Sequence, residues 1–150
     1  MVFWILVIGA AAIVLGLSVY AGMLLSQLHK QRKNEREGQA KRLAYLHDSI
    51  ATIALAMQQG QCPLSEGCIR IAVLLDNIPN AEQHGFAKRF PNLHEMYNRI
   101  KHMPTHDARK QFPKQEIRKM DKEREALEEE LAAPIQADVV EIIAWVKAAR

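Results

Sequence analysis

The sequence has few of the residues on which most recognisable protein chemistry depends. Its 150 residues include two cysteines and only 6% aromatic residues. It contains no glycine-rich phosphate loop, no nucleophile elbow, no H-E-x-x-H motif and no pair of C-x-x-C motifs. Internal repeats and low-complexity tracts are also absent. These absences give no support to an enzyme of the corresponding classes, and we expect no cofactor and no catalytic residues.

Charge is absent from one long stretch and concentrated in the next. Residues 1–28 carry no charged side chain, whereas residues 29–42 carry six basic and two acidic ones, a net charge of +4. Residues 43–150 have 14 basic and 15 acidic side chains, a net charge of −1. The net charge of +3 therefore belongs to a short collar. Because the remainder lacks a basic footprint, we expect no binding to nucleic acid.

The uncharged stretch predicts a transmembrane anchor over residues 1–28. About 20 mostly apolar residues suffice to cross a bilayer, and residues 2–28 exceed that length. A core helix of a small domain is rarely apolar on every face. A cleaved signal peptide, the stronger alternative, has a basic segment before a shorter apolar run, and no basic side chain precedes this run.

The collar, residues 29–42, predicts the orientation of the anchor. Basic residues near the end of a span stay on the cytoplasmic side. We therefore expect the N-terminus outside and residues 43–150 in the cytoplasm. The same side chains can contact anionic lipid headgroups, although fixing the topology alone would explain them. The topology and lipid-contact residues are Lys30, Arg32, Lys33, Arg36, Lys41 and Arg42.

Small residues recur every four positions within the predicted span, at Ser18, Gly22 and Ser26. Such spacing lets two helix backbones approach closely, which predicts a packing face for a homodimer or for another membrane protein. The general abundance of small residues in membrane spans is the alternative explanation.

Residues 43–150 have the periodicity of α-helices. Leu43, Leu46, Ile50, Ile53 and Met57 form one apolar stripe. Further helices are expected over 65–77, 80–90, 92–103 and 114–131, and a last one after Pro134. The fold class is thus all-α, with one transmembrane helix, a basic stalk over 29–42 that is expected to be a frayed helix, and a domain of about five to six helices over 43–150.

Several polar residues are interpreted as helix caps. Asn80, Asn92, Thr105 and Asp138 each precede an expected helix. Pro113 is expected to start or kink a helix. Residues 114–131 have a thin apolar stripe, with basic residues near the start and Glu128–Glu130 near the end. The helix dipole prefers the reverse order, so either a neighbour holds this helix or the small penalty is tolerated.

One set of side chains is a candidate metal site. Zinc binds two cysteines with two histidines, and the set here is Cys62, Cys68, His102 and His106. The C-x₅-C spacing is wider than usual, and Pro104 separates the histidines. Cys62 also lies near an expected helix start, where the pKa of a thiol can fall. The alternative is that Cys62 is a half-buried small hydrophobe.

A compact polar loop over residues 101–110 is the candidate binding site. Loops carry function more often than helices do, although helix capping also explains Thr105 and Asp107. The candidate binding residues are Lys101, His102, Thr105, His106, Asp107 and Arg109.

Short motifs along the chain are similar to those of one known family. The stretch Gln61-Cys62-Pro63-Leu64-Ser65-Glu66-Gly67 is followed by Ile69-Arg70 and Leu74-Leu75-Asp76. Phe90-Pro91, Ile100-Lys101-His102, Pro104-Thr105-His106 and Arg109-Lys110 come after them. With these motifs the chain resembles a gammaproteobacterial family of single-span inner-membrane proteins classed as a domain of unknown function. The resemblance implies a bacterial inner-membrane location and adds no activity or site residue.

The anchor and the helical domain together predict an interaction or regulatory module that recruits a protein partner at a lipid bilayer. The alternative function is a membrane-bound metal-binding protein or enzyme that uses the two cysteines with His102 and His106.

Overall fold

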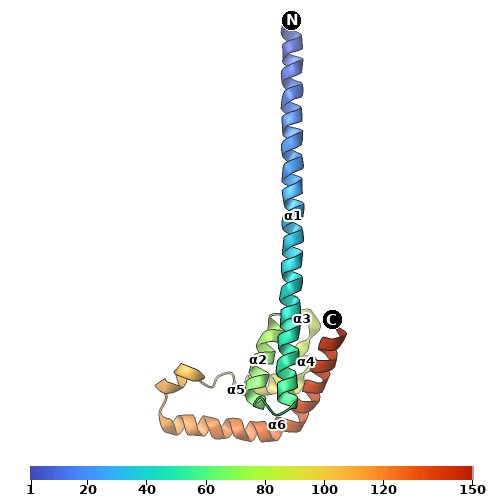
Figure 1. Ribbon diagram of the computed structural model, residues 1–150. Coiled ribbons are helices and arrows are strands. Elements are labelled where there is room, and N and C mark those ends of the chain that lie inside the picture. The colour runs from blue at the N-terminus through green and yellow to red at the C-terminus, as the bar shows by residue number, and fades with distance from the viewer. Residues whose placement is uncertain (150) are drawn as a thin grey trace. The chain divides into compact units, whose positions relative to one another are not determined.

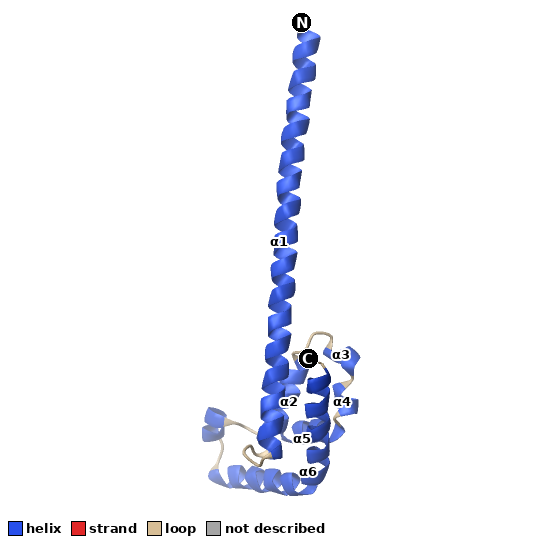
Figure 2. Ribbon diagram, turned by 45° about the vertical axis from the view of Figure 1, so that its right-hand side comes forward, coloured by secondary structure: helices blue, strands red, loops and turns tan. Residues whose placement is uncertain are grey.

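The structure, a computed structural model, describes residues 1–149 except for the side chain of His106, and every regular element within them is helical. The elements are α1 (Val2–Gln58), α2 (Leu64–Asp76), α3 (Ala81–His84), α4 (Phe86–Arg89), α5 (Pro91–Ile100), the 3₁₀ helix η1 (His106–Gln111) and α6 (Lys114–Ala148) (Figures 1 and 2). The all-α prediction is therefore confirmed. The chain divides into two compact units, Met1–Arg42 and Leu43–Arg150.

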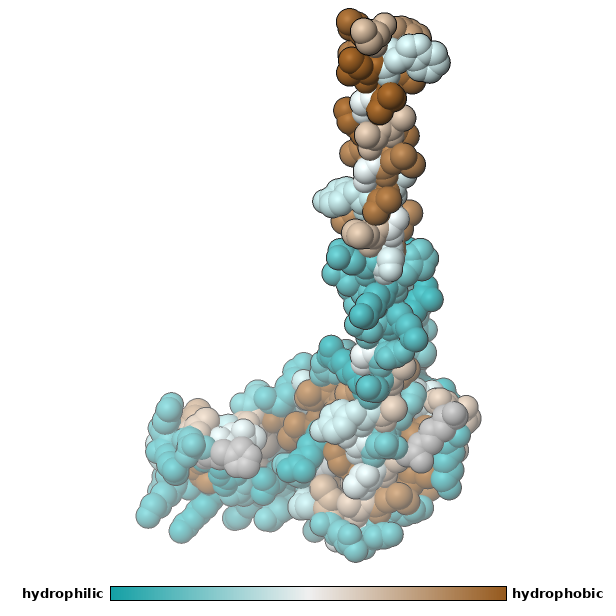
Figure 3. Space-filling view, turned by 45° about the horizontal axis from the view of Figure 1, so that its top comes forward, coloured by the Kyte–Doolittle hydropathy of each residue, from teal (hydrophilic) through white to brown (hydrophobic). Residues whose placement is uncertain are grey.

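The first unit is a single helical stretch of α1 in which every residue is exposed. Apolar side chains cover its beginning and polar side chains its end (Figure 3). The stalk, expected to be frayed, is helical throughout. The Ser18 hydroxyl donates a hydrogen bond of 2.8 Å to the Val14 carbonyl, so this polar group is satisfied within its own helix. Helix α1 is long and apolar enough to cross a membrane, with a mean hydropathy of 2.6 in its most apolar window.

The second unit builds its core from the last turns of α1 together with α2, α5 and α6. The predicted stripe on α1 is confirmed, because Leu46, Ile50 and Met57 are buried. Gly67 lies where α2 meets α1, and a Cβ at this position would overlap the buried Met57 side chain. Outside α1 the largest fully buried side chains are Cys68, Ile71, Leu75, Phe90, Leu93, Met96, Ile135, Val139, Ile142 and Val146.

Helix α6 corrects the prediction of two separate helices on either side of Pro134. The helix continues through this proline over 35 residues, and Figure 1 shows it bending between its first and last parts. Proline supplies no backbone N–H and its ring crowds the preceding turn, which bends a helix without necessarily ending it. Pro113 does stand directly before the helix, as expected. The bend separates a core-packed second half from a more exposed first half.

The predicted side-chain caps are wrong at four positions. Asn80 has a left-handed backbone with φ of 58°, and neither Asn80 nor Thr105 makes a capping hydrogen bond with its side chain. Asn92 lies inside α5, which begins at Pro91, and Asp138 lies inside α6. The expected helix over 80–90 is instead two short ones that meet at Gly85. Gly85 has φ of 59°, a conformation that favours glycine.

Candidate functional site

The candidate binding loop contributes to a cleft of about 220 Å³, but only in part. Thr105 and Arg109 line this cleft, whereas Lys101, His102 and Asp107 are exposed and do not. Lys101 donates to Asn98 Oδ1 at 3.0 Å, and Lys110 pairs with Asp107 at 2.6 Å. The side chain of His106 lies outside the described residues. The other lining residues are Ser65, Glu66, Ile69, Ile100, Met103, Pro104, Met120, Asp121 and Arg124.

Two arginines share one carboxylate at the wall of this cleft. Arg109 Nη2 lies 2.6 Å from Asp121 Oδ2, and Arg124 Nη2 lies 3.3 Å from Asp121 Oδ1. The hydrogen bond from Arg109 is the main reason why the pKa of Asp121 is lowered from its ordinary value. This ion-pair network joins η1 to α6 and so fixes the loop. Sequence reasoning named Arg109 but did not pair it with Asp121.

The described part of the chain does not support the metal alternative. None of its His, Cys, Asp and Glu side chains gather in a group of three or more that could hold a metal ion. Cys68 is fully buried, and desolvation raises its pKa to about 12. The thiol of Cys62 is half-buried and its pKa is also raised, mainly by burial. The alternative interpretation of Cys62 as a half-buried small hydrophobe is therefore supported, and a fall of its pKa at the start of α2 is not.

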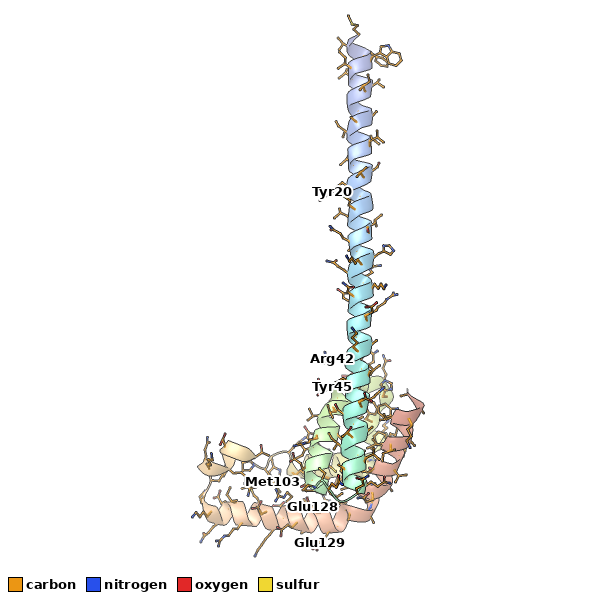
Figure 4. All side chains as sticks on the ribbon, in the orientation of Figure 1. Tyr20, Arg42, Tyr45, Met103, Glu128 and Glu129 are labelled. Atoms are coloured by element: carbon orange, nitrogen blue, oxygen red, sulfur yellow. The ribbon has the colours of Figure 1, made fainter. Side chains whose placement is uncertain are left out.

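A second and larger hollow is the groove between the last turns of α1 and α2, with a volume of about 620 Å³. Its apolar surface comes mainly from Ile53 on α1 and from Ile69, Val73 and Leu74 on α2. Tyr45 stands exposed at one end of it (Figure 4). Polar residues form its rim, namely Asp48, Ser49, Thr52 and Arg70. The sequence pattern gave no sign of this groove, because it depends on the pairing of two helices.

Two acidic residues of α6 bind the first turns of other helices, which sequence reasoning missed. The Asp138 carboxylate accepts hydrogen bonds from the backbone N–H groups of Asn92 and Leu93, at 2.8 and 2.9 Å. Glu128 accepts one from the Ser65 N–H at 3.1 Å. Figure 4 labels Glu128 and the exposed Glu129 beside it. The N-terminal amides of α5 and α2 are thus satisfied by α6, where the helix dipoles favour a negative charge.

The remaining predicted site residues lie in the first unit. The six collar residues and the set Ser18, Gly22 and Ser26 are all exposed there. Lys33 lies 3.9 Å from Glu37, and no heavy atom outside the helix backbone lies within 4 Å of the position of a Cβ on Gly22. Lipid contact by the collar and helix packing through the small residues stay predictions.

The fold defines a class of protein in which a long, partly apolar N-terminal helix leads into a small all-helical domain. Residues 14–142 match the family described as "Protein of unknown function (DUF2489)", and the chain belongs to this family. An uncharacterised protein of Haemophilus influenzae is 34% identical over 147 residues, which cover 96% of this chain and 95% of the relative. No solved structure matches the chain.

Proposed function

We propose that this protein is a membrane-anchored interaction module whose α1–α2 groove receives an amphipathic helix of a protein partner. The proposal rests on the groove. It is open, its apolar walls are formed by two helices, and its rim is polar. Amphipathic helices bind in such troughs through apolar side chains spaced at i, i+3, i+4 and i+7. A third helix laid along α1 and α2 would cover apolar surface that the domain leaves in contact with water.

Anchoring is the second part of the proposal. The first 28 residues are apolar and uncharged, and an apolar helix with all its faces exposed is stable in a bilayer rather than in water. The collar favours the inner membrane of a bacterium, with the domain on the cytoplasmic side. A green fluorescent protein fused to the C-terminus should fluoresce and sediment with membranes. Loss of sedimentation only after deletion of residues 1–28 supports the anchor, and a soluble full chain contradicts it.

The groove is tested by photo-crosslinking in the full chain within native membranes. A benzophenone amino acid at Thr52, on the rim, should crosslink to one discrete protein. Val73 and Val140 provide a matched pair, since both are exposed helical valines, at 45% and 54%, and only Val73 lines the groove. Val73→Glu should reduce the crosslink by about tenfold or more because it places a charge in an apolar contact. Val140→Glu should leave it unchanged.

The crosslinked peptide decides which kind of occupant the groove has. A segment with apolar residues at helical spacing supports the proposal. An extended segment, a lipid adduct, or a crosslink that is equally strong in the Val73→Glu and Val140→Glu variants contradicts it.

A further inference from the structure

The exposed face of the first half of α6 is divided into a basic and an acidic end. Arg118, Lys119 and Lys122 are exposed at helical spacing, and Glu125 and Glu129 continue the same face. Ala126, also exposed, is the small residue at the junction. Residues three or four apart on a helix are neighbours, so like charges meet within each end. The face is therefore a linear array of positive charge followed by negative charge.

These charged groups form no ion pair in the described part of the chain. No ion pair within 4 Å involves Lys114, Arg118, Lys119 or Lys122, or Glu125 or Glu129. The acidic residues that serve the fold are different ones, such as Glu128 at the start of α2 and Glu130, which lies 3.5 Å from Arg99. The charges of this face are thus exposed and available to an external partner.

A hollow of about 540 Å³ lies beside the basic end. Its walls contain four cationic residues and no acidic one. Lys110 and Arg109 are paired with Asp107 and Asp121, which leaves Lys114 and Arg118 to attract an anion. The lining consists of Arg109, Lys110, Phe112, Lys114, Ile117 and Arg118. The basic end is therefore suited to contact with carboxylates.

The order of these charges costs the isolated domain stability. Arg118 and Lys122 lie four residues apart, as do Glu125 and Glu129, and like charges at that spacing on a helix repel each other. A favourable contact that requires this order of charges would offset the loss of stability.

We propose that α6 pairs antiparallel with α6 of a second copy of this chain, so that the basic end of each helix faces the acidic end of the other. A two-fold axis between Glu123 and Arg124 places Lys122 opposite Glu125 of the second copy and Arg118 opposite its Glu129. The contact is self-complementary, as the interface of a symmetric dimer must be. Ala126 at the junction leaves room for close approach of the two backbones.

The contact is electrostatic, and this determines its behaviour. Each exposed ion pair contributes little and is screened by salt. The dimer should therefore weaken as the salt concentration rises. It should form most readily when both chains occupy one membrane, where the anchor raises their effective concentration. Neither the α1–α2 groove nor its occupant takes part.

The test exchanges charges between copies of the full chain. Chains with a donor or an acceptor fluorophore at the C-terminus are reconstituted in vesicles of zwitterionic phosphatidylcholine, and energy transfer is measured. The variant Arg118→Glu/Lys122→Glu makes the face largely acidic, and Glu125→Lys/Glu129→Lys makes it basic. Each variant alone should associate about tenfold more weakly than the parent at low salt. A mixture of the two variants should restore energy transfer, because acidic and basic faces then meet in both halves of the contact.

The matched control is Lys88→Glu/Lys147→Glu, which reverses two exposed lysines outside this face. It should associate like the parent. An unchanged Trp145 fluorescence spectrum shows that each variant is folded. Energy transfer that is absent in the parent, equal in all variants, or not restored in the mixture overturns the proposal. Equal transfer at all salt concentrations would place the dimer contact in the span instead.

Discussion

Two stretches of the same helix, α1, differ completely in what surrounds them. Residues 1–42 are all exposed and include the most apolar part of the chain. Residues 43–58 are more polar, yet they bury Leu46, Ile50, Ala54 and Met57. Apolar content alone therefore does not predict burial within the protein. The pattern does, because a stripe three or four residues apart faces a core, whereas apolar side chains all around a helix are typical of a membrane span or of the core of a large protein.

Two isoleucines of α1 test this difference, and we expect substitution of the buried one to cost the domain more stability than any other change proposed below. Ile50 is 0% exposed and Ile8 is 66% exposed. Ile50→Ala should lower the free energy of unfolding of the domain by about 2–5 kcal/mol, because it leaves a cavity in the core. Ile8→Ala should leave the domain unchanged. Urea unfolding in detergent, followed by Trp145 fluorescence in a Trp4→Phe background, measures both.

Similar losses of stability in the two isoleucine variants would contradict the division of α1. They would mean that residues 1–42 pack against the domain. A large loss for Ile50→Ala alone supports two units with separate energetics.

Much of the domain could be predicted from the sequence because its core follows local periodicity. The stripe at Leu46, Ile50 and Met57 emerged as expected. What could not be predicted depends on residues far apart in the sequence. Asp138 was interpreted as a cap for its own helix. Its carboxylate instead accepts a hydrogen bond from the backbone N–H of Leu93 in α5, which lies 45 residues earlier in the chain.

A signal for the role of Asp138 is nevertheless present in the sequence. It lies in the apolar stripe with Ile135, Val139 and Ile142, and all four are buried. A carboxylate in a stripe that faces the core must find hydrogen-bond donors there. Which donors these are depends on how α6 packs on α5, and the sequence does not show that packing. The bend at Pro134 is a similar case. The local rule that proline ends a helix predicted a helix boundary there, whereas α6 continues through the proline with a kink.

A buried carboxylate and an exposed one should differ in how much they contribute to the free energy of unfolding. Asp138→Ala should lower the free energy of unfolding by about 2–3 kcal/mol, because the amides of Asn92 and Leu93 lose a charged acceptor. Asp107 is the control, since its pair with Lys110 is exposed. Asp107→Ala should change the free energy by less than about 0.5 kcal/mol. Equal effects in the same urea assay would show that Asp138 does not hold α5.

We expect a weaker effect at Asp121, which is half-buried within the more exposed first half of α6. Its folded-state pKa lies below the ordinary value of 3.8, chiefly because Arg109 donates a hydrogen bond to its charged form. The unfolded chain therefore takes up the proton first as the pH falls. The stabilisation is fully present above the unfolded pKa and is lost as the pH falls through the lower folded pKa.

Thermal unfolding between pH 6 and pH 2 measures this contribution in the parent and in Asp121→Asn. The variant should be slightly less stable at neutral pH, and the difference should shrink toward pH 2 as the parent loses the charge on Asp121. Because the pair is partly exposed, solvent screening keeps the effect small. A difference that is constant with pH would show that the side chain acts through packing and not through its charge. The ion pair between Arg109 and Asp121 would then contribute nothing to stability through its charge.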